Sequence, residues 1–163
     1  MGVVPRGAVA IVCVCVRTAK IALVTRSAPP DKSIWALPGG KVEVGEPTID
    51  AAIRELHEEC GLNSDSVQWH EAPFTVTDVI RPAVGEPDAG TKFHYLLAQT
   101  FCKTAPHVDP AQLVAGDDAG DAGWYSLQEI EGMQASGVCA DGVEAVVKRG
   151  LLLHEHGLLP LTK

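Results

Sequence analysis

Residues 40–62 read GKVEVGEPTIDAAIRELHEECGL, and this stretch decides the fold of a chain of 163 residues. Between Pro47 and Leu62 it carries Glu55, Glu58 and Glu59 with no lysine to offset them. Residues three and four apart are neighbours on the surface of an α-helix, so a helix would gather these carboxylates on one arc. The chain therefore presents a concentrated acidic surface that needs an explanation.

The apolar residues of this stretch predict a helix from Pro47 to Cys60. They recur at intervals of three and four residues, which is the pattern of a helix that packs on a core. Pro47 suits the first helical position, and Gly61 suits a left-handed cap at the C-terminal end. The residues expected to face the core are Ile49, Ala52, Ile53, Leu56 and Cys60.

The acidic arc has two interpretations. A charged helix face is usually only solvated, but such a face normally mixes charges, and the like-charged pair Glu55–Glu59 is mildly unfavourable. Arg54 can offset part of this charge through Glu58, four residues further on. Carboxylates, backbone carbonyls and water are the ligands that Mg²⁺ and Mn²⁺ prefer. We therefore favour a divalent cation site over a solvated face.

The residues that precede the helix support a ligand site. Leu37–Gly40 reads LPGG, which predicts a turn, and its two glycines allow the backbone to approach a metal or ligand closely. A second loop, Val44–Pro47, then leads into the helix. The order of loop, acidic helix and glycine cap would suit a unit that holds a metal against a phosphate.

The stretch resembles the signature of the Nudix hydrolase family, which reads G, five residues, E, seven residues, R-E-aliphatic-x-E-E-x-G-aliphatic. The chain matches at every defined position, namely Gly40, Glu46, Arg54, Glu55, Leu56, Glu58, Glu59, Gly61 and Leu62. The resemblance implies an α/β fold, a Nudix-type α/β/α sandwich with a mixed β-sheet. It also implies that residues 1–163 form a single domain of this kind.

The same resemblance implies roles for individual residues. The ligands of Mg²⁺ or Mn²⁺ would be Glu55, Glu58, Glu59 and the carbonyl oxygen of Gly39. The residues that orient the motif without reacting would be Gly40, Glu46, Arg54 and Gly61. The general base would be either Glu58 or an acid from a loop elsewhere in the chain, and both alternatives stay open.

A second acidic segment, residues 115–121, reads AGDDAGD shortly before Trp124. It could be a plain flexible loop. In the Nudix family, however, an acid a few residues before this tryptophan often supplies a metal ligand or the general base. The resemblance makes Asp118 the first candidate, ahead of Asp117 and Asp121.

Two further segments resemble the ADP-ribose pyrophosphatase-type branch of that family, namely Gly116–Ala119 followed by Trp124, and Phe93–Leu97. This implies hydrolysis of the diphosphate linkage of a nucleoside diphosphate derivative, such as ADP-ribose or a similar nucleotide sugar, to a nucleoside monophosphate. Two alternatives stay open. One is a nucleoside triphosphate pyrophosphohydrolase of the 8-oxo-dGTP type, and the other is a catalytically silent nucleotide sensor.

Three residues are weaker candidates for binding the substrate. Arg26 ends a predicted strand and could reach a phosphate, as could Arg81, although either could be an ordinary surface arginine. Trp35 could stack on a base, but we favour a role in packing.

Composition limits the partners. The chain has 13 lysines and arginines against 21 acids, a formal net charge of −8, whereas nucleic acids and membrane surfaces select basic patches. We expect a nucleotide-sized substrate, no stable nucleic-acid complex and no membrane association, and the resemblance allows a homodimer. Five cysteines with no C-x-x-C pair predict free thiols in a reducing, cytoplasmic compartment.

The remaining pattern predicts strands on both sides of the acidic helix. Residues 7–16 and 21–26 should form a hairpin, and 67–80, with a break at Pro73, and 93–102 should be strands. Residues 104–123 read as a long irregular loop before a short strand at 124–125. Ser126 and Glu129 then predict a capping box, and residues 141–154 a final helix.

Overall fold

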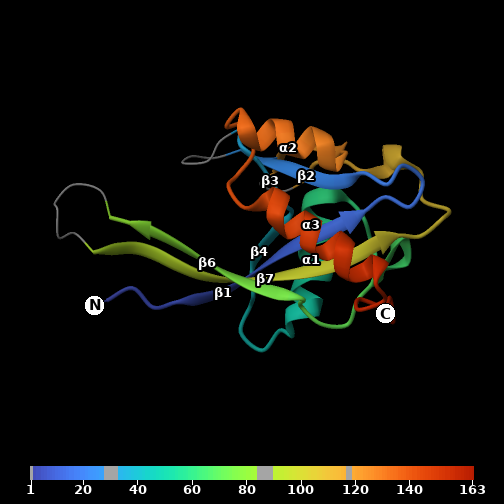
Figure 1. The fold of residues 1–163 in the computed structure, drawn as a ribbon. Helices are drawn as coiled ribbons and strands as arrows, with labels where there is room; N and C mark the ends of the chain where they lie inside the picture. Colours follow the sequence, from blue (N-terminus) through green and yellow to red (C-terminus); the bar gives the residue numbers. More distant parts are fainter. Residues whose placement is uncertain (1, 28–32, 84–89, 117–118) are drawn as a thin grey trace.

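The computed structural model describes residues 2–27, 33–83, 90–116 and 119–163. Figure 1 shows its elements. The strands are β1 (Arg6–Val14), β2 (Ile21–Arg26), β3 (Trp35–Ala36), β4 (Gly39–Lys41), β5 (Val67–Trp69), β6 (Thr75–Pro82), β7 (Thr91–Thr104) and β8 (Ala119–Tyr125). The α-helices are α1 (Thr48–Cys60), α2 (Leu127–Ala135) and α3 (Val143–Glu155), and short 3₁₀ turns lie at Ser64–Ser66 and Pro110–Gln112.

The described strands form one mixed sheet of eight strands in which β1 is central. The main path runs β3-β2-β1-β7-β5, while β4 pairs with β1, β6 with β7 and β8 with β2. Strands β1 and β7 are parallel over nine residue pairs, and the other pairings are antiparallel. The expected mixed sheet and the expected hairpin of β1 and β2 are both confirmed.

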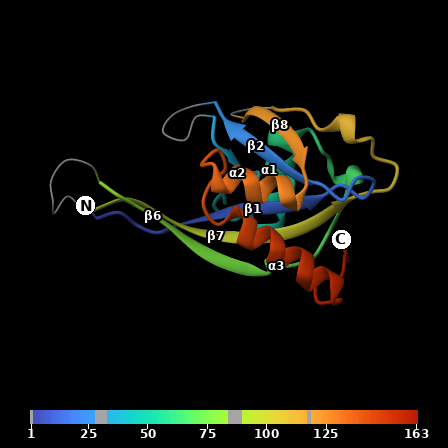
Figure 2. The same ribbon diagram turned by 45° about the horizontal axis from the view of Figure 1, so that its top comes forward.

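Helices cover both faces of this sheet, as Figures 1 and 2 show together. Alternate residues of β1 point to opposite faces, so Ile11 packs with Leu56 of α1 while Val12 packs with Ile130 of α2 and Val147 of α3. The two apolar clusters that result lie above and below the sheet. The architecture is the expected α/β/α sandwich.

Helix α1 follows the prediction closely. It begins at Thr48, because Pro47 has extended backbone angles and lies at the cap position rather than inside the helix. Gly61 has a left-handed φ of 70° and donates its N–H to the carbonyl of His57, as a C-terminal cap does. Ile53 is only half-buried, whereas Ala51 is buried and was not predicted to be.

Two predicted loops are partly strand. Gly39–Lys41 forms β4 instead of continuing a turn, because it pairs with Ala8–Ala10 of β1. Residues 119–123 belong to β8, because they pair with Leu23–Arg26 of β2. Both segments are short and rich in glycine. Each forms a strand only because it pairs with a strand that is distant in the sequence.

The other predicted elements are present with shifted ends. The chain between β5 and β6 breaks the strand around Pro73, and α3 spans nearly the predicted residues. Ser126 and Glu129 form the predicted capping box at the start of α2. All five cysteines are buried free thiols. No helix within the described ranges is long and apolar enough to cross a membrane.

Candidate active site

Arg54 is the centre of the hydrogen bonds around α1. Its Nε and Nη2 donate to the two carboxylate oxygens of Glu46 at 2.8 and 3.0 Å, and Nη2 also donates to the carbonyl of Lys41 at 3.0 Å. Its Nη1 donates to Glu55 at 2.9 Å and to Glu58 at 3.2 Å. These bonds hold the Glu46 loop and the acidic face of α1 in one arrangement, and the orienting role of Glu46 and Arg54 stays a prediction.

The ionisation of Glu46 agrees with this role. Hydrogen bonds from Arg54, with a further one from the backbone N–H of Glu43, lower the pKa of Glu46 to about 2. The same contacts raise the pKa of Arg54. The pair therefore stays charged across the physiological range and does not exchange protons.

The two glycines before α1 bring β4 against its carboxylates. The N–H of Gly39 donates to Glu59 Oε2 at 3.1 Å. A side chain at Gly40 would collide with the carboxylate of Glu55, and one at Gly39 would collide with the carbonyl of Val9. Glu55 and Glu59 thus meet the same dipeptide, and the glycines serve close approach rather than a turn.

Glu55 is the most buried of the three acids that Arg54 bonds, with 13% of its side chain exposed against 15% for Glu46 and 37% for Glu58. Burial raises its pKa, while the hydrogen bond and charge of Arg54 act in the opposite direction. Repulsion from the carboxylates of Glu58 and Glu46 adds to the increase. A cation beside Glu55 would offset the cost of burying its negative charge and would weaken its repulsion by Glu58 and Glu46. Both effects are expected at a metal site.

The donor set fits a hard divalent cation in its chemistry but is not fully assembled. Glu55, Glu59 and the carbonyl of Gly39 would supply only oxygen ligands, as Mg²⁺ and Mn²⁺ prefer. Within the described part of the chain, no group of three or more His, Cys, Asp or Glu side chains converges on one point. One cause is visible, because Nη1 of Arg54 binds the carboxylates of both Glu55 and Glu58.

The segment before β8 lies along the end of α1. The N–H of Val114 donates to the carbonyl of Cys60, and the N–H of Gly116 donates to that of Glu59, both at 3.1 Å. A side chain at Gly116 would collide with the Glu58 carbonyl. Asp117 and Asp118, the next residues in sequence, lie outside the described residues.

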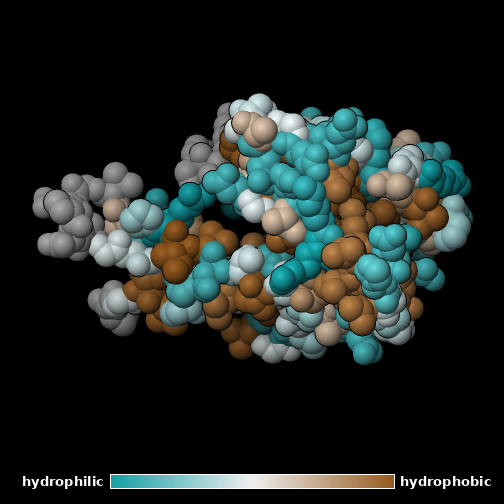
Figure 3. Space-filling view, in the orientation of Figure 1, coloured by the Kyte–Doolittle hydropathy of each residue, from teal (hydrophilic) through white to brown (hydrophobic). Residues whose placement is uncertain are grey.

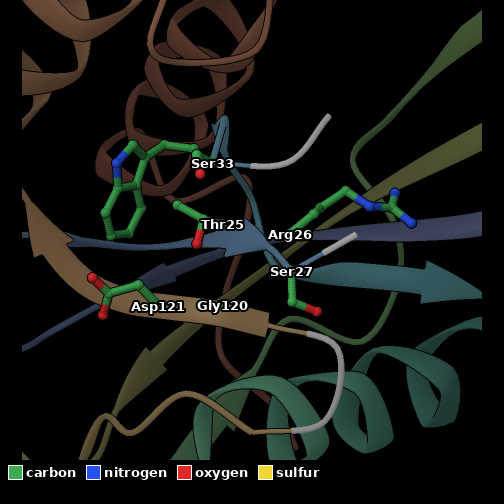
Figure 4. A pocket seen from close by; sticks show the side chains of 7 residues that line it. Thr25, Arg26, Ser27, Ser33, Gly120 and Asp121 are labelled. Carbon is green, nitrogen blue, oxygen red and sulfur yellow. The ribbon is translucent and has the colours of Figure 1, made fainter. Parts of the chain in front are cut away.

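A hollow of about 430 Å³ opens where the end of β2 meets β8 and is drawn in Figure 4. Arg26 and Asp121 extend to opposite sides of Thr25 there. The residues that line it are Thr25, Arg26, Ser27, Ser33, Trp35, Gly120 and Asp121. Arg26, Trp35 and Asp121 all line this hollow, and the guanidinium of Arg26 extends away from Asp121. Arg81 lies elsewhere, on β6.

Trp35 packs in the fold, as we favoured, and its contact with a base stays a prediction. Its ring meets Tyr125 edge-on, with 5.0 Å between ring centroids, and it packs against the apolar cluster under α2 and α3. It also lines the hollow. The hydroxyls of Thr25, Ser27 and Ser33 were not predicted here. Thr25 and Ser27 lie at the end of β2, and the N–H of Ser33 donates to the carbonyl of Arg26 beside them.

Comparison with known proteins identifies the family. Residues 4–140 match the model described as NUDIX domain. A protein of Methanocaldococcus jannaschii named ADP-ribose pyrophosphatase is 32% identical over 111 residues, which are 68% of this chain and 57% of that protein. A Bacillus subtilis protein named putative 8-oxo-dGTP diphosphatase is 44% identical over 55 residues, which are 34% of this chain and 35% of that protein.

The fold agrees with this match. The crystal structure of a C. elegans Ap4A hydrolase binary complex has a TM-score of 0.65 at 19% identity, covering 93% of this chain and 98% of that one. The chain therefore belongs to the NUDIX domain family. Its matched regions span 57% or less of the curated relatives named above.

Proposed function

We propose that this protein is a divalent-metal-dependent hydrolase that cleaves the diphosphate linkage of a nucleoside diphosphate derivative. The preferred substrate would be ADP-ribose or a similar nucleotide sugar, and one product would be a nucleoside monophosphate. Membership of the NUDIX domain family supports the class of reaction. The substrate is supported by the similarity to the M. jannaschii protein named ADP-ribose pyrophosphatase.

The observation that carries the proposal is the meeting of Glu55 and Glu59 at Gly39–Gly40. Two carboxylates from successive turns of α1 reach one dipeptide whose glycines leave no room for a side chain. One arginine, Arg54, is shared among Glu46, Glu55 and Glu58 and therefore offsets only part of this negative charge. Such an arrangement serves the binding of a cation better than it serves stability, because it concentrates like charges.

The proposal assigns a metal-binding or proton-accepting role to each acidic residue. Glu55, Glu59, Glu58 and the Gly39 carbonyl would hold Mg²⁺ or Mn²⁺, with Glu58 turning away from Arg54 to do so. The bound cation supplies neutralisation of the phosphate charge and a lower pKa for a coordinated water. Either Glu58 or Asp118 would accept the proton of the attacking water, and that choice remains part of the proposal.

The hollow beside β2 would hold the part of the substrate that does not react. Arg26 offers a guanidinium for a phosphate, and Trp35 offers a ring edge or face for a base. The hydroxyls of Thr25, Ser27 and Ser33 and the carboxylate of Asp121 could pair with ribose or base. Arg81, on β6, would contribute only if the substrate reached that strand.

A second candidate function is the hydrolysis of an oxidised nucleoside triphosphate. Its support is the local similarity to the B. subtilis protein named putative 8-oxo-dGTP diphosphatase. The two functions differ in their products. Inorganic pyrophosphate would indicate the triphosphate, and ribose 5-phosphate would indicate ADP-ribose.

The proposal extends to location and partners. Five buried free thiols are in keeping with a reducing cytoplasm. A net charge of −8 favours a small nucleotide substrate over nucleic acid or an anionic membrane.

A substrate panel tests the proposal. Purified protein with Mg²⁺ or Mn²⁺ is incubated with ADP-ribose, NADH, diadenosine polyphosphates and 8-oxo-dGTP, and the products are separated by chromatography. Turnover of ADP-ribose to AMP and ribose 5-phosphate supports the main candidate. Binding of nucleotide without any turnover across the panel would instead indicate a catalytically silent sensor.

A further inference from the structure

An aromatic pair stands beside the hollow at the end of β2. Trp35 of β3 meets Tyr125 of β8 with 5.0 Å between ring centroids and 65° between ring planes. Such an edge-on contact is a preferred arrangement of two aromatic rings. Trp35 lines the hollow, whereas the described residues that line it do not include Tyr125. An effect of Tyr125 on a ligand in the hollow would therefore pass through a neighbour such as Trp35.

Gly123 decides where the ring of Tyr125 lies. A Cβ built on Gly123 would be 2.9 Å from Cε2 of Tyr125 and 3.2 Å from its hydroxyl oxygen, closer than a Cβ normally approaches other atoms. Asp121, Gly123 and Tyr125 alternate along β8, so they share one face of the sheet. The ring thus lies back over Gly123 with its hydroxyl directed toward Asp121. Only a residue without a side chain at position 123 leaves room for this arrangement.

The neighbouring strand holds this ring from the side. Strand β2 pairs with β8 so that Ile21 lies opposite Tyr125 and Leu23 lies opposite Gly123. Both of these β2 side chains are fully buried. The chain that follows Tyr125 is fixed as well, because Ser126 begins the capping box of α2. These contacts leave the ring of Tyr125 little freedom of movement.

The backbone of Trp35 is held independently of Tyr125. Its N–H donates to the carbonyl of Val138 at 2.9 Å, and its carbonyl accepts from the N–H of Ala140 at 2.8 Å. On its other side Trp35 pairs with Thr25 of β2. These bonds fix the two residues of β3, but they leave the direction of the indole ring to side-chain packing. Loss of the Tyr125 ring should therefore release the indole without unfolding β3.

The charge state of Tyr125 suits a packing role. Burial raises the pKa of its hydroxyl, and the negative charges of Asp121 and Glu129 raise that pKa further. Even a fully solvated tyrosine titrates only near about pH 10. The ring is therefore neutral at physiological pH, and it supports Trp35 by packing rather than by charge.

We propose that Tyr125 is a positioning residue that holds the ring of Trp35 in the orientation needed to stack on the base of the substrate. This role rests on the proposed function, since it takes the hollow beside β2 as the place of the base. A ring that is already held loses little freedom when a base stacks on it, so the contact stabilises the complex more than a mobile side chain would. Tyr125 would thus favour substrates that carry an aromatic base.

Binding without turnover tests the proposal first. AMP is titrated into the whole protein without added metal, and calorimetry gives the Kd. Tyr125→Leu should weaken AMP binding about tenfold, because the indole is no longer held. Tyr125→Phe keeps the ring and should bind AMP like the wild type. Gly123→Ala should weaken binding as well, since its Cβ displaces the ring. Thermal melts show whether each variant folds, and Gly123→Ala carries the test if Tyr125→Leu does not.

A double-mutant cycle tests whether Tyr125 acts through Trp35. In a Trp35→Leu protein, Tyr125→Leu should cause no further loss of AMP affinity. The matched control is Tyr95→Leu, which removes the contact of Tyr95 with Phe93 at 5.3 Å between ring centroids. That pair lies on β7, whose first residues project with β6 from the body at the left of Figures 1 and 3. The control should bind AMP like the wild type.

Steady-state kinetics separate this role from the proposed function. With ADP-ribose and Mg²⁺, Tyr125→Leu should raise KM about tenfold and change kcat less than about twofold. Unchanged AMP affinity in Tyr125→Leu would overturn the role of Tyr125, as would an equal further loss in the Trp35→Leu protein or a wild type that binds no AMP at about 1 mM. Hydrolysis by the wild type would still stand in each case. The predicted AMP binding without any turnover would instead remove the proposed function and keep the role of Tyr125.

Discussion

The guanidinium of Arg54 binds both oxygens of the Glu46 carboxylate, from Nε at 2.8 Å and from Nη2 at 3.0 Å. Eight residues of sequence separate the two, and the bonds tie the loop that carries Glu46 to the face of α1. The remaining nitrogen, Nη1, reaches Glu55 and Glu58. The Arg54 side chain therefore sets the positions of three acids. It can do so because its planar guanidinium presents several N–H donors in fixed directions.

Replacing this arginine by lysine tests the role of its shape. Arg54→Lys keeps the charge but cannot make the paired bonds, so we expect a loss of about 1–2 kcal/mol in the free energy of unfolding. Hydrolysis should fall as well, since Glu55 and Glu58 lose their common anchor. Urea denaturation measures the free energy of unfolding. Arg6→Lys, at an exposed position at the start of β1, is the control and should change neither; an equal loss in both variants would contradict the assigned role.

Acid stability provides a second test of the same pair. The pKa of Glu46 is about 2 in the folded protein, below its ordinary value, so the folded state binds fewer protons than the unfolded state between these values. The contribution of Glu46 is therefore present near neutral pH and is lost as the pH falls toward 2. Glu46→Gln should be less stable than wild type at pH 7, with the difference shrinking by pH 3. A difference independent of pH would contradict the ion pair.

The two glycines of β4 should respond differently to alanine. A Cβ at Gly39 meets the backbone carbonyl of Val9, which cannot move away, so Gly39→Ala should cost at least about 2 kcal/mol of stability. A Cβ at Gly40 meets only the movable carboxylate of Glu55. Gly40→Ala should therefore lower the rate and metal affinity more than the thermal midpoint. Thermal midpoints and Mn²⁺ titrations of the two variants measure stability and metal affinity. A larger loss of stability in Gly40→Ala than in Gly39→Ala would contradict the geometry.

Arg26 is the most direct test of the hollow beside β2. If it binds a substrate phosphate, Arg26→Ala should raise KM about tenfold while changing kcat less, because a ground-state contact is lost. Arg149→Ala, on α3, is the control. Steady-state kinetics on the preferred substrate supply both constants, and an unchanged KM would remove Arg26 from the binding surface.

The features that local sequence determines were predicted well. Helix α1, its Gly61 cap and the Ser126–Glu129 capping box depend on residues within a few positions of one another. Strand β4 and the first half of β8 were missed, because their glycines become strand only by pairing with β1 and β2. Non-local pairing of this kind leaves little pattern in a single sequence.

The same distinction applies to the site. Spacing along one helix was enough to predict that Glu55, Glu58 and Glu59 share a face. It also predicted the contact of Arg54 with Glu58. It could not show that Arg54 also bonds Glu55, or that Thr25 and Asp121 line one hollow, because rotamers and strand pairing decide these points. Asp118 was proposed from resemblance alone and stays a prediction outside the described residues.

Glu59 offers the most direct measurement of the central claim, that the acids of α1 support metal-dependent cleavage of a diphosphate. Glutamine can still accept the hydrogen bond from the Gly39 N–H, so Glu59→Gln should fold with nearly the wild-type thermal midpoint. With ADP-ribose and Mg²⁺, we predict that wild type releases AMP and ribose 5-phosphate and that the variant's kcat is lower by roughly 10³-fold or more. A variant as fast as wild type would contradict the account.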